Sequence, residues 1–243
     1  RVAAGFACRV VPLMSNVSRL HMPALSEPKW HKASCWVASF DILGFTNLID
    51  IDHDTIEAEF VIEDYEETLR HLESRCDVYA PGCLDYLWFS DTFAIFTPDD
   101  TPKSYTVIQQ AAKHFIERCL YSSIPIRGAI SVGAFVRGHE NRSLIGRAFV
   151  EAHLFGEDQD WLGLILTPTA IQMAASYGLE PQHHDFIASA EIPMRKCRDT
   201  QVMAYRFQNG AANFSSPLLP ILERMKQRAG AAHFGKYERT IEF

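Results

Sequence analysis

The stretch Phe40-Asp41-Ile42-Leu43-Gly44-Phe45-Thr46 decides how this sequence is interpreted. The apolar run over residues 34–40 predicts a buried strand. An acidic residue stands at its carboxyl end, and a glycine-containing turn into a helix follows at once. Ends of strands are where α/β folds place ligands, and a turn that opens a helix offers free backbone N–H groups to phosphate oxygens. The stretch therefore predicts a site for a metal-bound nucleotide.

A second carboxylate, Asp91, lies between two short apolar runs at 84–89 and 92–96, which predict a hairpin. If this hairpin lies beside the first strand, Asp41 and Asp91 meet at one edge of the sheet. Two carboxylates that share two divalent ions ~3.5–4 Å apart make a two-metal site for in-line displacement at phosphorus. An isolated Asp is more often a helix cap or a turn residue, so the pair carries the interpretation.

The rest of the chain alternates between strand and helix patterns. Apolar spacing predicts helices over 55–75, 104–121, 146–155 and 216–228 and one opening at Pro168, with strands over 124–136, 162–166 and 202–207. This order predicts an α/β (α+β) ferredoxin-like sandwich with additions. We expect an N-terminal extension over residues 1–33, one catalytic domain over 34–210 and a C-terminal helical extension over 211–243. The helix at 216–228 is a candidate dimer or regulatory element.

Composition excludes several classes of protein. A net charge of −7 argues against a nucleic-acid partner, because neutralising phosphates needs a concentrated basic surface. No run approaches the ~18 apolar residues that a membrane span needs. Six cysteines without C-x-x-C spacing argue against a zinc site or a disulfide framework, and we expect reduced thiols and a cytoplasmic location.

Four motifs together resemble class III nucleotidyl cyclases, the catalytic domain of adenylate and guanylate cyclases. The Asp41 stretch resembles their first metal motif, and Ser90-Asp91-Thr-Phe-Ala-Ile-Phe the second. Ile126-Arg127-Gly128-Ala129-Ile130 is similar to their central strand, and Gly146-Arg-Ala-Phe-Val-Glu-Ala152 to the segment that opens the following helix. The order and approximate spacing match over residues 34–207.

The resemblance implies a role for each matched residue. Asp41 and Asp91 would bind two divalent ions, Mn²⁺ or Mg²⁺, with the Ile42 carbonyl as a further ligand. Backbone amides around Gly44, Phe45 and Thr46 would hold the β- and γ-phosphates, and Arg127 would neutralise the triphosphate. Within the basic cluster at 195–198, Lys196 would reach the phosphates from the partner subunit of a homodimer, although a solvated loop explains that cluster equally well.

Four positions depart from the family pattern. Purine cyclases read their base with a lysine and an acidic residue, where this chain has Leu87 and Ser143. An asparagine and an arginine that the family carries near the transition state are replaced by Val150 and Leu154. Apolar side chains cannot replace buried polar contacts without changing what binds. The remaining candidates to meet transition-state charge are three arginines: Arg137, Arg142 and Arg147.

Intact metal motifs without purine readers resemble the bacterial Pycsar pyrimidine cyclases. That resemblance implies a homodimer that converts UTP to cyclic UMP during antiphage defence, with the product read by a separate effector protein. Three alternatives stay open: a cytidylate cyclase, a purine cyclase with an unusual pocket, and a catalytically inactive pseudo-cyclase. A diguanylate cyclase is set aside, because the chain lacks the Gly-Gly-Asp/Glu-Glu-Phe signature.

Overall fold

The computed structural model describes residues 31–44, 63, 66–67, 70, 82–89, 91–137, 144–188, 192–196, 200–207, 218–229 and 231–243. The expected extension at 1–33 lies outside these residues except for its last three, which form the start of the first strand. Of the helix expected over 55–75, only residues 63, 66, 67 and 70 are described, and all four are helical.

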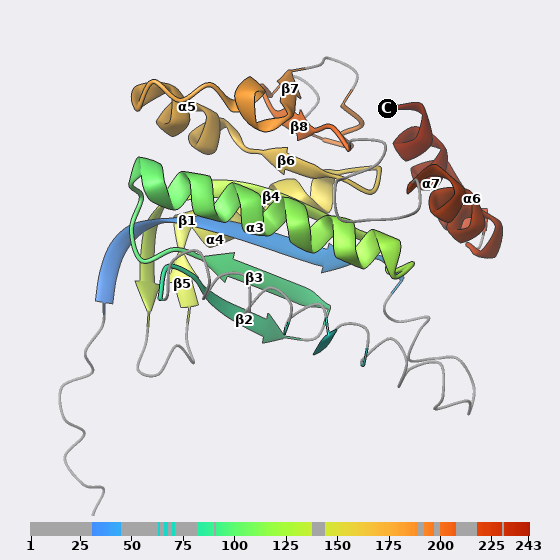
Figure 1. The fold of residues 1–243 in the computed structure, drawn as a ribbon, viewed down its shortest axis with the longest axis horizontal. Helices are drawn as coiled ribbons and strands as arrows, with labels where there is room; N and C mark the ends of the chain where they lie inside the picture. Colours follow the sequence, from blue (N-terminus) through green and yellow to red (C-terminus); the bar gives the residue numbers. More distant parts are fainter. Residues whose placement is uncertain are drawn as a thin grey trace, which may run out of the picture.

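The core of the molecule is one mixed sheet of eight strands (Figure 1). Seven follow the order β2-β3-β1-β4-β6-β8-β7, and β5 pairs with β4. Their bounds are β1 His31–Ile42, β2 Asp85–Phe89, β3 Thr92–Phe96, β4 Ile126–Arg137, β5 Leu144–Gly146, β6 Leu164–Leu166, β7 Phe186–Ala188 and β8 Met203–Tyr205. The pairs β1–β3, β1–β4 and β2–β3 are antiparallel, and β4–β6 is parallel. The fold class predicted from the sequence is confirmed.

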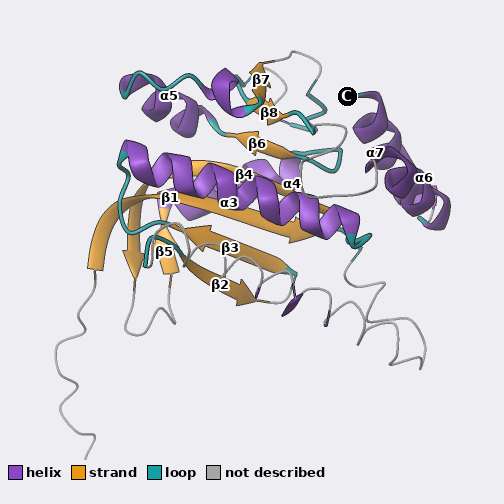
Figure 2. Ribbon diagram, in the orientation of Figure 1, coloured by secondary structure: helices purple, strands orange, loops and turns teal. Residues whose placement is uncertain are grey.

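Helices cover both faces of the central strands, as Figure 2 shows for α3 in front and α4 behind. The helix α3 spans Pro102–Tyr121, α4 spans Arg147–Asp158 and α5 spans Pro168–Ser176. Even-numbered residues of β1, from Trp36 to Ile42, pack in one cluster with α3, whereas Cys35 and Val37 pack with α4. Because side chains alternate along a strand, Asp41 lies on the α4 face of the sheet.

Aromatic packing supports the end of β1 from the α3 side. The Phe40 and Phe115 ring centroids lie 4.8 Å apart, and Phe115 stacks on Phe93 at 4.4 Å. All three side chains are buried. Edge-to-face and offset-stacked pairs add about 0.5–1.5 kcal/mol each beyond the burial of their area. The strand that carries Asp41 is therefore held on a well-packed layer.

On the opposite face, α4 approaches the sheet closely through small residues. Ala148 and Ala152 are fully buried one turn apart. At Gly156, one turn further on, an added Cβ would lie 3.7 Å from the Ser39 carbonyl oxygen and 3.8 Å from Gly128 Cα. Small side chains at this spacing let the helix axis lie near the strands. This packing brings the carboxyl end of α4 next to the ends of β1 and β4.

The C-terminal helices α6 (Leu218–Arg228) and α7 (Ala231–Glu242) stand at the end of the sheet toward which β1 runs (Figure 1). The apolar face of α6, built on Leu218, Leu222 and Met225, is buried in the same cluster as α3 and β1. These three residues therefore serve the core of their own chain, whereas Leu219 on the same helix is 47% exposed, and a dimer or regulatory role of the helix stays a prediction.

Most expected elements are found, with shifted ends. The first strand runs past Asp41 to Ile42, because both residues keep ladder partners on β4, and the turn follows at Leu43 and Gly44. Three short elements were not predicted: β5, β7 and a 3-10 turn at Pro181–His184. The helix α7 lies within the helical extension expected over 211–243, although its own bounds were not predicted. The three-residue strands are too short for a periodic signal. Within the described part of the chain, no helix is long and apolar enough to cross a membrane.

Candidate active site

Asp41 and Arg127 form an ion pair where β1 and β4 run side by side. The two residues are cross-strand partners in the antiparallel ladder. Arg127 donates from Nη2 to Asp41 Oδ2 at 2.6 Å and from Nε to the same oxygen at 2.9 Å. The side chains are 15% (Asp41) and 7% (Arg127) exposed. The register of two long strands thus fixes this pair.

A second set of contacts holds Arg127 from behind. Its Nη1 donates to the Gln159 carbonyl oxygen at 2.8 Å, and the Gln159 amide donates to the Gly128 carbonyl oxygen at 2.8 Å. Glycine is required beside the arginine, because a Cβ at 128 would lie 2.4 Å from Phe40 Cδ1. The guanidinium is therefore clamped between Asp41 and the segment that follows α4.

Asp91 lies in the turn between β2 and β3, next to the end of β1. The Ile42 N–H donates to the Asp91 carbonyl oxygen at 3.0 Å, and Asp41 is the ladder partner of Thr92. The structure thus brings Asp41 and Asp91 to one end of the sheet. Among the described residues, neither Asp41 Oδ1 nor the Asp91 carboxylate has a hydrogen-bond or ion-pair partner.

Of the predicted phosphate-binding turn, Gly44 is described, whereas Phe45 and Thr46 lie outside the described residues. Gly44 has φ +73°, in the left-handed region that favours glycine. The Leu43 N–H donates to the Pro125 carbonyl oxygen at 2.8 Å, which ties the turn to the start of β4. The glycine therefore allows the turn that begins directly after β1.

The donor set at this end of the sheet fits a nucleotide-bound divalent ion. No group of three or more His, Cys, Asp or Glu side chains that could hold a metal exists among the described residues. Mg²⁺ commonly takes only one or two carboxylates and completes its octahedron with phosphate and water oxygens. Asp41 Oδ1, the Asp91 carboxylate and the Ile42 carbonyl would hold such an ion, and Asp41 Oδ2 remains committed to Arg127.

The basic cluster that the sequence singled out is docked on the end of α4. The Lys196 N–H donates to both Asp158 carboxylate oxygens, at 2.9 and 3.0 Å. Arg195 donates from its backbone to the Asp158 carbonyl oxygen at 2.9 Å and from its guanidinium to the Glu157 carbonyl oxygen. Both side chains are exposed, and the Lys196 ammonium has no partner in the described part of the chain.

Sequence reasoning missed Lys236, which α7 brings to the same end of the sheet. Burial lowers the pKa of Lys236, the positive charges of Arg127 and Arg195 lower it further, and Asp160 and Asp41 raise it. These groups come from four separate parts of the chain. A single lysine in a short amphipathic helix gives no sequence signal of this placement.

The positions that depart from the family pattern are described in part, on β2 and on α4. Leu87 is half-buried and packs with the cluster on the α4 face of the sheet. Val150 and Leu154 point away from the core on α4, 53% and 57% exposed. Arg147 is exposed at the start of α4, whereas Ser143, Arg142 and the Arg137 side chain lie outside what the structure describes.

No family model and no curated protein matches the sequence. Solved structures do match it. The adenylyl cyclase CyaB from P. aeruginosa matches with a TM-score of 0.53 at 13% identity, covering 74% of this chain and 97% of that one. A dimeric guanylyl cyclase domain of the RhoGC fusion protein from the aquatic fungus Blastocladiella emersonii matches with a TM-score of 0.53 at 16% identity, covering 73% and 96%. The guanylate cyclase domain of RhGC from Catenaria anguillulae, solved with GTP, matches with a TM-score of 0.50 at 17% identity, covering 73% and 99%.

These matches define the fold. The chain has the fold of adenylyl and guanylyl cyclase domains, and it spans nearly the full length of each.

Proposed function

We propose that this chain is a metal-dependent nucleotidyl cyclase. The observation that carries the proposal is the pairing of Asp41 with Arg127 beside Asp91, at the end of the central strand of a cyclase fold. Two carboxylates with unpartnered oxygens and one clamped guanidinium offer ligands for a metal-bound triphosphate. Reaction at the α-phosphorus would give a 3′,5′-cyclic monophosphate and pyrophosphate.

Each residue has a distinct part in this reaction. Two divalent ions, Mn²⁺ or Mg²⁺, would activate the ribose 3′-hydroxyl and clamp the phosphates, held by Asp41, Asp91 and the Ile42 carbonyl. The bond from the 3′-oxygen to the α-phosphorus forms as the bond to the bridging oxygen of pyrophosphate breaks, and the hydroxyl proton is released. Arg127 neutralises charge on the phosphates, and the turn at Gly44–Thr46 offers backbone N–H groups to the β- and γ-phosphates.

For the substrate we propose UTP. Leu87 replaces a purine-reading lysine and packs against apolar neighbours, so it offers no hydrogen bond to a purine edge. A purine bound here would leave polar groups unmet at about 1–3 kcal/mol each. Uracil rather than cytosine follows from the resemblance to the Pycsar cyclases. That resemblance also suggests antiphage signalling in the cytoplasm, with cyclic UMP read by a separate effector protein.

We further propose a homodimer whose two active sites are each shared between subunits. Three exposed apolar side chains, on β5 and on the outer face of α4, support it: Ile145, Val150 and Leu154 are 67%, 53% and 57% exposed. Lys196, whose ammonium has no described partner, would then reach the phosphates held by the partner subunit.

Subunit mixing tests this arrangement. Asp41→Ala and Lys196→Ala chains, each inactive alone, should regain part of the activity when mixed, because one site of each hybrid dimer keeps both groups. Absence of rescue under conditions where subunits demonstrably exchange would contradict the shared site.

One observation favours a second candidate, a nucleotide-binding pseudo-cyclase. The α4 positions where cyclases carry transition-state groups hold Val150 and Leu154. Asp41, Asp91 and Arg127 are all present and lie at the same end of the sheet, which favours an active cyclase.

The proposal is tested by incubating the purified chain separately with ATP, GTP, CTP and UTP in the presence of Mn²⁺. Mass spectrometry identifies the products, and a coupled assay measures pyrophosphate. We expect a cyclic monophosphate and pyrophosphate in equal amounts, abolished by EDTA. Binding of nucleotide without any cyclic product would establish the pseudo-cyclase instead.

A further inference from the structure

We propose that α7 is part of the active site and that Lys236 binds the phosphate chain of the substrate together with Arg127 and Arg195 of the same chain. This inference rests on the proposed function, since the phosphate chain is that of a nucleoside triphosphate. It adds a ligand from the C-terminal helices, which the sequence motifs do not assign.

One side of α7 is fixed to the segment that follows α4. Arg239 pairs with Asp160 at 2.7 Å and also donates from Nε to the Asp160 carbonyl oxygen at 2.8 Å. One residue further, the Thr240 hydroxyl accepts the Leu162 N–H at 2.8 Å. The carboxyl half of the helix is therefore held by side-chain contacts to backbone as well as by an ion pair.

Lys236 lies one turn before Thr240 on the same side of the helix. The Thr240 hydroxyl donates to the Lys236 carbonyl oxygen at 2.8 Å, as expected for residues four apart. The segment that holds α7 begins at Gln159, whose carbonyl oxygen accepts Arg127 at 2.8 Å. The segment thus connects Lys236 with the clamped guanidinium.

The charges around Lys236 leave it without a counter-ion. Its carboxylate neighbours are Asp160 and Asp41, and the first is paired with Arg239 and the second with Arg127. In the described structure the Lys236 ammonium makes no hydrogen bond or ion pair. It is half-buried, and burial lowers its pKa, as do the nearby cations Arg127 and Arg195.

A half-buried ammonium with two arginines nearby, whose neighbouring carboxylates are already paired, is stabilised by a bound anion. Cations from β4, from the loop at 192–196 and from α7 converge on the end of the sheet where Asp41 lies. A linear polyphosphate carries several negative charges and can bind several such cations at once. This points to the triphosphate of the substrate or the pyrophosphate that leaves.

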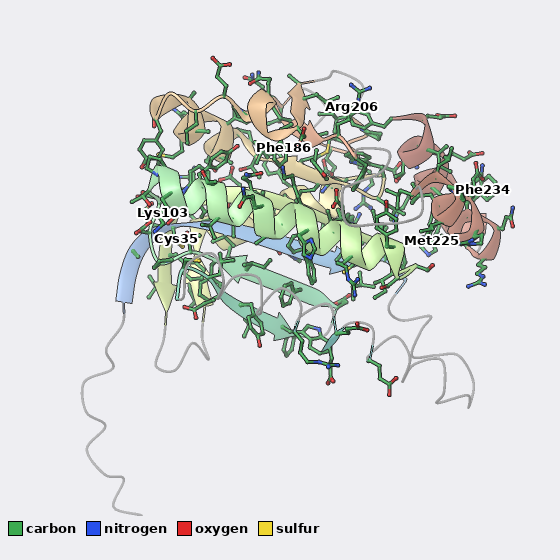
Figure 3. The ribbon with its side chains drawn as sticks, in the orientation of Figure 1. Cys35, Lys103, Phe186, Arg206, Met225 and Phe234 are labelled. Atoms are coloured by element: carbon green, nitrogen blue, oxygen red, sulfur yellow. The ribbon has the colours of Figure 1, made fainter. Side chains whose placement is uncertain are left out.

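The test measures binding of inorganic polyphosphate by calorimetry, with EDTA present and no nucleotide. The full chain is compared with Lys236→Met, which keeps the alkyl stem, and with Lys236→Arg, which keeps the charge. Lys103→Gln is the matched control, because Lys103 is exposed at the opposite end of α3 from the C-terminal helices (Figure 3). Thermal melting establishes that every variant is folded.

We expect the Kd of tripolyphosphate to rise about tenfold in Lys236→Met and to stay within about twofold in Lys236→Arg and Lys103→Gln, since a charge-assisted hydrogen bond contributes about 1.5–3 kcal/mol. A parallel loss for pyrophosphate assigns Lys236 to the leaving phosphates, and a loss for tripolyphosphate alone assigns it to the intact substrate chain. Unchanged binding in folded Lys236→Met, or no binding by the wild type, overturns the inference.

The outcome is separable from that of the proposed function. If polyphosphate binding depends on Lys236 but no triphosphate is cyclised, the cyclase assignment fails and the site stands. If cyclic product forms and Lys236→Met binds polyphosphate normally, the Lys236 site fails and the cyclase assignment stands.

Discussion

The end of the sheet around Asp41 and the edge strand β2 are built in opposite ways. At the first, Asp41 and Arg127 are ladder partners with 15% and 7% of their side chains exposed, and a backbone carbonyl clamps the arginine. At the second, Phe89 is 77% exposed and Leu87 is half-buried. Thr92 pairs with both Asp41 and Phe89, so the three residues share one rung of the ladder.

This contrast suggests that the proposed reaction and the proposed choice of base depend on two differently built regions. The groups that would handle phosphate in the proposed function, Asp41 and Arg127, are fixed by the register of two long strands. The edge that would face the base presents the apolar side chains of Leu87 and Phe89. The proposed chemistry therefore rests on residues of the ladder, whereas the proposed choice of base rests on side chains at an open edge.

Removing either carboxylate should have the largest effect. We expect Asp41→Asn and Asp91→Ala to lose cyclase activity by about 10³-fold or more, because a metal contributes several kcal/mol of transition-state stabilisation. Initial rates of pyrophosphate release with saturating Mn²⁺ measure this loss. Substantial activity in both variants would refute the two-metal assignment.

The two carboxylates should differ in their effect on stability. Asp41→Ala leaves the Arg127 guanidinium buried without its partner, which should cost about 2–3 kcal/mol and lower Tm by about 5–10 °C. Asp91→Ala should change Tm little, because its carboxylate has no partner among the described residues. Thermal melting of both variants without metal decides this, and equal losses would contradict the pairing in the structure.

At the open edge, Phe89→Ala should raise the KM for every triphosphate by about tenfold, since stacking of a base on an aromatic ring contributes about 1–3 kcal/mol. Trp88 is the matched control, because it is the next residue of β2 and so points to the other face. Trp88→Ala should leave KM within about twofold. A larger effect from Trp88 than from Phe89 would place the base on the α3 face instead.

The sequence predicted the end of the sheet that carries Asp41 and Asp91 better than the elements around it. Asp41 and Asp91 could be predicted to meet because Asp41 ends one apolar run, Asp91 separates two others, and β1, β2 and β3 are strongly patterned. The ion pair to Arg127 could not be predicted from pattern alone, since it depends on the β1–β4 register, which joins residues 86 positions apart.

The C-terminal helices show where sequence reasoning failed. The spacing of Leu218, Leu222 and Met225 predicted α6 correctly, but an amphipathic pattern does not reveal which surface its apolar face covers. The position of Lys236 depends on how α7 docks through Arg239 and Thr240, which are polar contacts without periodicity. Such contacts become visible only once the chain is folded.

The most direct test of the central claim is a competition among equimolar ATP, GTP, CTP and UTP with Mn²⁺, with the cyclic products quantified by mass spectrometry. The account predicts that cyclic UMP dominates, by about 10²-fold over cyclic AMP and cyclic GMP if two polar groups of a purine go unmet, with one pyrophosphate per cyclic product. Predominance of a cyclic purine nucleotide would contradict the assignment of the base edge, and absence of every cyclic product would contradict the cyclase itself.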